Sequence, residues 1–192
     1  MTGQARLDYN DDTMNDDSAL FKENRMPAAL ENDRFRLEID VAGYEFPASV
    51  KDIFDANWLI FRVTLQSRFS AWRWQVEDAG ALTWELDDCV NWLRALSSGE
   101  AVATDSWQFS EPDVSLDIIR GENGAPHGLT VNLMDEFQPP TKVLVPRKNN
   151  IVSLRFHAPP STLRALADSL AESLARFPQR GARPVLGRPV ER

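Results

Sequence analysis

Apolar and polar residues between positions 83 and 99 follow the period of an amphipathic helix. The apolar side chains recur three and four positions apart, which places them on one side of a helix: Leu86, Cys89, Val90, Leu93 and Leu96. Thr83 can accept hydrogen bonds from the first free backbone N–H groups, and Gly99 is the residue type that ends helices. The pattern therefore predicts a helix of about four turns that packs on a sheet.

A second stretch near the C-terminus has the same helical period. It starts after Pro159-Pro160, where Ser161 is the expected N-terminal cap, and it stops at Pro178. Its apolar side recurs at the helical spacing and consists of Leu163, Leu166, Ala167, Leu170, Leu174 and Phe177. We expect this helix to pack on the same sheet as the first.

The rest of the central chain shows the two-residue alternation of half-buried strands. Strands are expected around residues 35–41, 59–65, 72–76, 107–109, 114–118, 129–133, 143–145 and 152–156. Turns join them, including an Asn123-Gly124 pair that predicts a β-hairpin. The predicted fold class is α+β: a single domain with one largely antiparallel meander sheet of about seven to eight strands and two amphipathic helices packed on it.

Charge and composition divide the chain into three parts. Residues 1–33 carry a net charge of −5 and lack an apolar period, which predicts an acidic, disordered extension. Residues 179–192 are rich in Arg, Pro and Gly and predict a flexible tail. The globular domain is expected to span residues 34–178, and it holds −6 of the total charge of −8 because the last fifteen residues, 178–192, carry +3.

The overall composition predicts a cytoplasmic globular protein. Hydrophobic residues make up 43% of the 192 positions, which is enough for one core. No apolar run approaches the roughly 18 residues of a membrane span, and the acidic start has no signal-peptide pattern. The single cysteine, Cys89, excludes an internal disulfide and is expected to lie in the core.

Motifs that carry catalysis or bind a cofactor are absent from the sequence. It contains no Gly-rich phosphate loop, no GxSxG elbow and no paired-histidine metal motif, and His127 and His157 lie in no catalytic pattern. Glu111 and the pair Asp135-Glu136 could act as paired carboxylates, but solvated acids at strand ends are the favoured interpretation. We therefore predict a protein that is not an enzyme and holds neither metal nor cofactor.

The negative charge of the central region indicates what kind of partner it binds. An acidic body repels the phosphate backbone of nucleic acids, so direct binding of DNA or RNA is disfavoured. A basic protein is the more natural ligand, although an acidic surface also serves solubility.

Several short motifs resemble those of the WapI family of bacterial immunity proteins. In chain order they are GYEFP at Gly43–Pro47, NWL at Asn57–Leu59, TxEL at Thr83–Leu86, WL at Trp92–Leu93, FSEPD at Phe109–Asp113 and FPxR at Phe177–Arg180. Together they cover about residues 35–180. Their large apolar side chains have a plain structural interpretation as parts of a shared core.

The resemblance implies a protective function. Such a protein binds and neutralises the C-terminal toxin domain of a cognate polymorphic toxin, which for the named member of the family is a nuclease directed at tRNA. Because a nuclease site is basic, an acidic immunity surface can occlude it and speed association. The contacts we predict are Asp55, Glu85, Asp87 and Asp88. The alternative is a non-enzymatic scaffold or small-ligand-binding module of the same fold.

Overall fold

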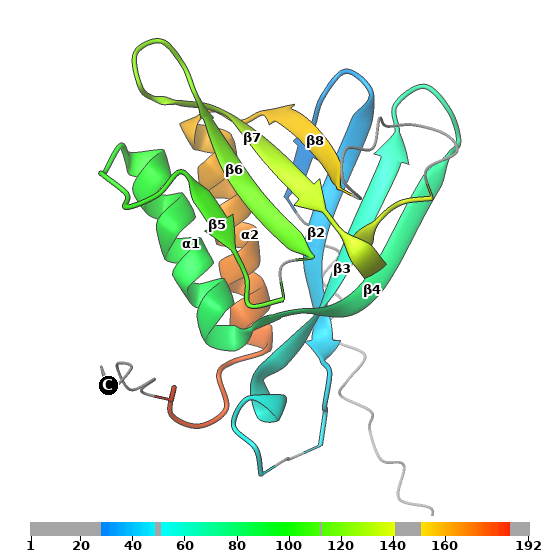
Figure 1. The fold of residues 1–192 in the computed structure, drawn as a ribbon, viewed down its shortest axis with the longest axis vertical. Helices are drawn as coiled ribbons and strands as arrows, with labels where there is room; N and C mark the ends of the chain where they lie inside the picture. Colours follow the sequence, from blue (N-terminus) through cyan, green and yellow to red (C-terminus); the bar gives the residue numbers. More distant parts are fainter. Residues whose placement is uncertain (1–27, 49–50, 112, 141–150, 185–192) are drawn as a thin grey trace, which may run out of the picture.

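The computed structural model describes residues 28–48, 51–111, 113–140 and 151–184. They form an α+β fold with eight strands, two α-helices and two short 3-10 helices (Figure 1). In chain order these are β1 (Ala29–Glu31), β2 (Phe35–Tyr44), η2 (Asp55–Asn57), β3 (Trp58–Ser67), β4 (Arg73–Leu82), α1 (Thr83–Ser98), β5 (Ser106–Gln108), β6 (Val114–Arg120), β7 (Pro126–Leu133), η3 (Asp135–Phe137), β8 (Val152–His157) and α2 (Pro160–Arg176).

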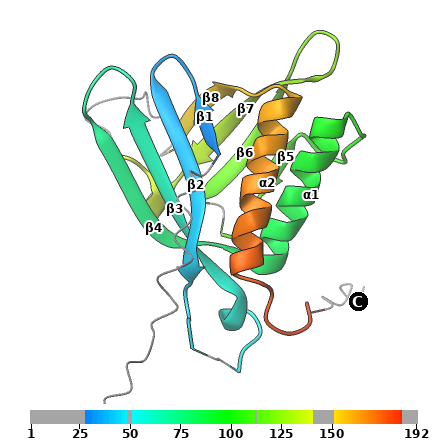
Figure 2. The ribbon, with the colours of Figure 1, turned by 180° about the vertical axis from the view of Figure 1, so that it is seen from behind.

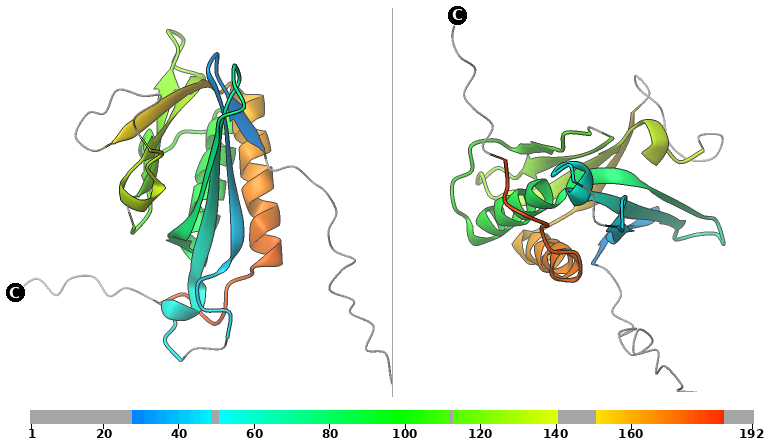
Figure 3. Two further views of the ribbon diagram at one scale, coloured as in Figure 1. Left: turned by 90° about the vertical axis from the view of Figure 1, so that its right-hand side faces the viewer. Right: turned by 90° about the horizontal axis from the view of Figure 1, so that it is seen from below.

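The strands form two sheets, which corrects the prediction of a single one. The first sheet has the order β1-β2-β3-β4 and the second the order β5-β6-β7-β8, and all neighbouring strands within each sheet are antiparallel. Each sheet is therefore a meander, as the alternation predicts. The views in Figure 3 show the two sheets as separate layers, and Figure 2 shows α1 and α2 running side by side next to them.

Helix α1 is buried over more than one face. The five predicted apolar positions are buried, but so are Trp84 and Trp92, which the single-face prediction left out. The Trp92 indole N–H donates to the carbonyl of Thr104 at 3.0 Å, and its ring lies 5.8 Å from that of Trp107 in β5. The helix thus contacts both layers, and the side chains of both sheets and both helices form one contiguous core.

The two predicted N-terminal caps are also corrected. The N-cap of α1 is Leu82, whose N–H donates to the Glu85 carboxylate at 3.0 Å, so Thr83 lies inside the first turn. The N-cap of α2 is Pro159, and the Pro159 carbonyl accepts the N–H groups of Thr162 and Leu163, so Ser161 lies inside that helix. The predicted end of α1 is confirmed, because Gly99 adopts the left-handed conformation with φ 80°.

Three other sequence predictions concern one turn and two strands. The Asn123-Gly124 turn joins β6 to β7, with Gly124 at φ 76°. Strand β1 pairs with β2 inside the stretch predicted as an extension, so regular pairing begins before residue 34. The strand predicted around residues 143–145 lies outside the described residues.

Candidate functional site

Motifs that are scattered over the sequence meet at one end of the molecule. Gly43–Pro47 spans the end of β2, Asn57–Leu59 spans the end of η2 and the start of β3, and Thr83 begins α1. Phe109–Asp113 joins β5 to β6, and Phe177–Arg180 follows α2. The end of β2, the starts of β3 and α1 and the end of α2 lie in the lower half of the ribbon in Figure 1.

The motifs are joined by hydrogen bonds, with Asn57 at the centre. Its fully buried amide donates to the carbonyls of Ile53 at 2.7 Å and Arg180 at 2.8 Å. Its oxygen accepts the Arg180 N–H and the Thr83 hydroxyl, both at 2.8 Å. The side chain therefore uses its two donors and both lone pairs of its oxygen, which explains how a buried amide is tolerated there.

A cleft of about 470 Å³ opens beside this joint. Its wall combines carboxylates with the aromatic side chains of two motifs, and the lining residues are Glu45, Phe46, Asp55, Trp58, Asp78, Ala79, Glu111, Asp113 and Glu136. We call it the acidic cleft. Its residues come from the ends of β2 and β3, from β4, from the turn before β6 and from η3, so both sheets contribute.

Among the residues that the structure describes, the carboxylates of the acidic cleft have no compensating cation. Within the described part of the chain, none of the six forms an ion pair with Lys or Arg, and only Asp78 accepts a hydrogen bond, from the Ala79 N–H at 2.8 Å. Burial, and then the neighbouring negative charges, raise the pKa of Glu45 above its ordinary value. The same two causes raise the pKa of Asp113.

A raised carboxyl pKa means that the ionised form is less stable in the folded chain than in the unfolded one. At neutral pH, therefore, Glu45 and Asp113 oppose folding instead of supporting it. Groups that destabilise a fold and lie together in a cleft are candidates for function, and a ligand with positive charge would relieve their repulsion.

The four acids predicted as contacts do not form one group. Asp55 lines the acidic cleft, and Asp87 is exposed on α1. Glu85 accepts the N–H of Leu82 and both the N–H and the hydroxyl of Ser110, so its carboxylate links α1 to the FSEPD motif. Asp88 pairs with Arg183 at 2.7 Å.

Sequence reasoning missed most of the acidic cleft. Glu45 and Asp113 stood inside the family motifs, and Glu111 and Glu136 were considered only as a possible carboxylate pair. Asp78 sits on an edge strand and gives no sequence signal. The available signal was the presence of acids in motifs otherwise made of large apolar residues.

In the ranges that the structure describes, the other reactive groups do not assemble a site. The His127 and His157 rings meet edge to face, with their centroids 4.9 Å apart, on exposed positions of β7 and β8. Cys89 is fully buried, and burial raises the pKa of its thiol, which keeps it protonated as a core residue. The described residues contain no group of three or more His, Cys, Asp or Glu side chains placed to hold a metal ion.

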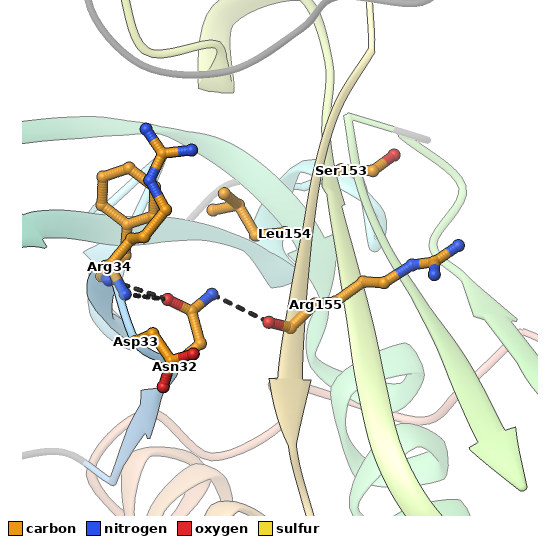
Figure 4. Close-up of a pocket in the computed structure, with 7 residues that line it drawn as sticks. Asn32, Asp33, Arg34, Ser153, Leu154 and Arg155 are labelled. Atoms are coloured by element: carbon orange, nitrogen blue, oxygen red, sulfur yellow. Dashed lines mark hydrogen bonds between the residues drawn. The ribbon is translucent and has the colours of Figure 1, made fainter.

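A second pocket, of about 360 Å³, lies between the two sheets (Figure 4), and we call it the seam pocket. There the Asn32 oxygen accepts the N–H groups of Arg34 and Phe35, both at 2.8 Å, and its amide donates to the Arg155 carbonyl at 2.8 Å. Leu154 points from β8 into the pocket, whereas Ser153 and Arg155 point away from it. The Asn32 side chain therefore joins the turn between β1 and β2 to the second sheet.

None of the helices in the described ranges combines the length and the apolar character that crossing a bilayer demands.

The fold and the acidic cleft define an α+β protein with a site suited to positively charged groups. The sequence model of the immunity protein WapI-like family matches residues 29–178, and the chain belongs to this family. Its members are immunity proteins, which typically are not enzymes and act by neutralising a toxin. No individual curated protein matches the chain significantly.

Proposed function

We propose that this protein neutralises its cognate toxin by holding a basic surface of the toxin domain in the acidic cleft. The observation that carries the proposal is the set of six carboxylates in one cleft without a described cation partner. Family membership implies that the partner is a toxin. The negative charge of the cleft favours an electrostatic contact with a basic surface.

The toxin we propose is the C-terminal domain of a polymorphic toxin with nuclease activity. A nuclease presents Lys and Arg side chains to phosphates, and these are the groups that six carboxylates attract. The aromatic side chains of Phe46 and Trp58 in the same wall offer stacking surfaces for a guanidinium. Neutralisation is stoichiometric: the basic groups that bind the cleft are withheld from nucleic acid, and neither protein is modified.

Among the contacts predicted from sequence, Asp55 stands first because it lines the acidic cleft. Asp87 is an outer contact on the exposed side of α1. Glu85 and Asp88 approach the toxin with carboxylates already bound to Ser110 and Arg183, so we expect smaller effects from replacing them.

The test uses the toxin domain encoded next to this protein. The domain is expressed in a susceptible cell with and without the protein, and the purified pair is then studied by calorimetry. We expect growth to be rescued, a one-to-one complex to form, and the toxin to dissociate unaltered in mass.

Two outcomes would contradict the proposal at different levels. Neither rescue nor a complex would reject neutralisation of that toxin. Rescue by a complex whose affinity is unchanged after the cleft is neutralised would keep neutralisation and reject the acidic cleft as the contact.

A further inference from the structure

The segment that follows α2 turns back under the fold and binds the loop between β2 and β3. Figure 1 shows this segment passing beside η2 at the lower end of the molecule. The sequence prediction places residues 179–192 in a flexible tail, and the family match stops at residue 178. The contacts made by residues 177–183 are nevertheless extensive, and they give this segment a definite place.

Arg180 makes the densest set of these contacts. Its guanidinium lies 3.5 Å from the centre of the Tyr44 ring and donates to the carbonyls of Phe46 at 2.9 Å and Pro47 at 3.1 Å. A planar fork with several donors suits this combination of ring and carbonyls, which a lysine ammonium cannot reproduce. The side chain therefore holds the start of the loop by its main chain.

The other end of the loop is held by the backbone of the same residue. The N–H and the carbonyl of Arg180 both bind the Asn57 side chain, which also binds Ile53 and Thr83. Tyr44 donates its hydroxyl to the Pro178 carbonyl, and its ring meets that of Phe177 edge-on at 5.6 Å. Residues 177–180 thus connect both ends of the loop to the start of α1.

This loop carries part of the acidic cleft. Glu45 and Phe46 lie at its start and Asp55 near its end, and all three line the cleft together with Trp58, the residue after the loop. We propose that the segment 177–180 is a clasp that positions this wall of the acidic cleft for the toxin, with Arg180 as its positioning residue and Asn57 as its anchor. The proposal rests on the function proposed above.

A positioning role for Arg180 predicts the opposite effect on toxin affinity from the one that its charge alone predicts. Removing a positive charge near an acidic surface strengthens the attraction for a basic partner. Arg180→Ala should nevertheless weaken toxin binding, because the free loop must be ordered again on binding. Arg183→Ala removes the same charge from the same segment but breaks only an exposed ion pair with Asp88, so it is the matched control.

The experiment measures hydrogen exchange in the free protein and affinity for the adjacent toxin domain. In Arg180→Ala we expect the hydrogen-bonded amides of the loop, those of Glu45, Ala56 and Asn57, to exchange at least about tenfold faster, while β3 and β7 keep their protection. Toxin affinity should fall by about tenfold, with an intermediate loss in Arg180→Lys and no loss in Arg183→Ala.

The two readouts separate the possible failures. Unchanged exchange in the loop of Arg180→Ala would overturn the clasp, whatever the toxin does. Faster exchange with unchanged affinity would overturn its role in positioning the cleft. A wild-type protein that does not bind the toxin would reject the proposed function, while the exchange data would still decide whether the clasp exists.

Discussion

The acidic cleft and the seam pocket are both polar hollows between the two sheets, but their polar groups do opposite things. At the seam, the Asn32 side chain binds three main-chain groups and joins the turn after β1 to β8. In the acidic cleft, six carboxylates face solvent and one another without a cation partner in the described ranges. The Asn32 side chain has its hydrogen bonds satisfied within the chain, whereas the six carboxylates leave their charge for a partner.

This difference separates polar groups that stabilise the fold from those that serve a partner. A satisfied side-chain hydrogen bond contributes about 0.5–1.5 kcal/mol to stability, whereas like charges held together reduce it. The seam should therefore respond to mutation through stability, and the acidic cleft through binding.

The largest effect is expected from neutralising the acidic cleft. The triple variant Glu45→Gln, Glu111→Gln and Asp113→Asn should lose about 100-fold or more in toxin affinity, measured by calorimetry, since charge pairs across an interface are strongly coupled. Its melting temperature should not fall. The matched control is Asp33→Asn, Glu100→Gln and Glu122→Gln, which removes the same charge away from the cleft. An equal loss in the control would show that only net charge matters.

The seam should give the opposite result. Asn32→Ala removes the acceptor of the Arg34 and Phe35 N–H groups and the donor to Arg155, so unfolding should become easier by about 1–3 kcal/mol. Chemical denaturation measures this change. Toxin affinity should stay the same. A variant that loses affinity while keeping its stability would show that the seam pocket also serves binding.

Salt should weaken the toxin complex. The screening length shortens from about 10 Å at 0.1 M to about 3 Å at 1 M salt, so attraction between the acidic cleft and a basic surface decreases. We expect roughly a tenfold loss of affinity over this range, mainly as slower association. The cleft triple variant should show a flatter dependence. A complex that is insensitive to salt would favour an apolar anchor as the main contact.

The smallest effect concerns stability and pH. Glu45 and Asp113 have raised pKa values, so their ionisation costs stability above those values, and the cost disappears as pH falls below their ordinary values of 4.5 and 3.8. The double variant Glu45→Gln, Asp113→Asn should therefore be slightly more stable than the wild type at pH 7. Because solvent screens both groups, the gain is under about 1 kcal/mol.

Thermal unfolding as a function of pH provides the measurement. The two melting curves should converge at acidic pH, where the wild-type carboxyls are protonated in both states. A variant that is less stable than the wild type at pH 7 would show that these acids support the fold.

The sequence by itself determined the elements and their buried sides. Leu86, Cys89, Val90, Leu93 and Leu96 lie inside as the helical spacing predicts, and Gly99 ends α1. The alternation from Phe35 to Val41 gives the inward and outward faces of β2 correctly. These features are readable because burial periodicity and turn conformation are local properties of a few consecutive residues.

Only the tertiary structure decided how the elements meet. Trp92 of α1 contacts Trp107 of β5, and the acidic cleft brings together Glu45, which follows β2, and Glu136 of η3. Thr83 binds Asn57 instead of capping its helix, and Arg180 binds a loop more than 120 residues earlier in the chain. Such contacts leave no period in the sequence, because they join residues through the packing of distant elements and not through the geometry of any one of them.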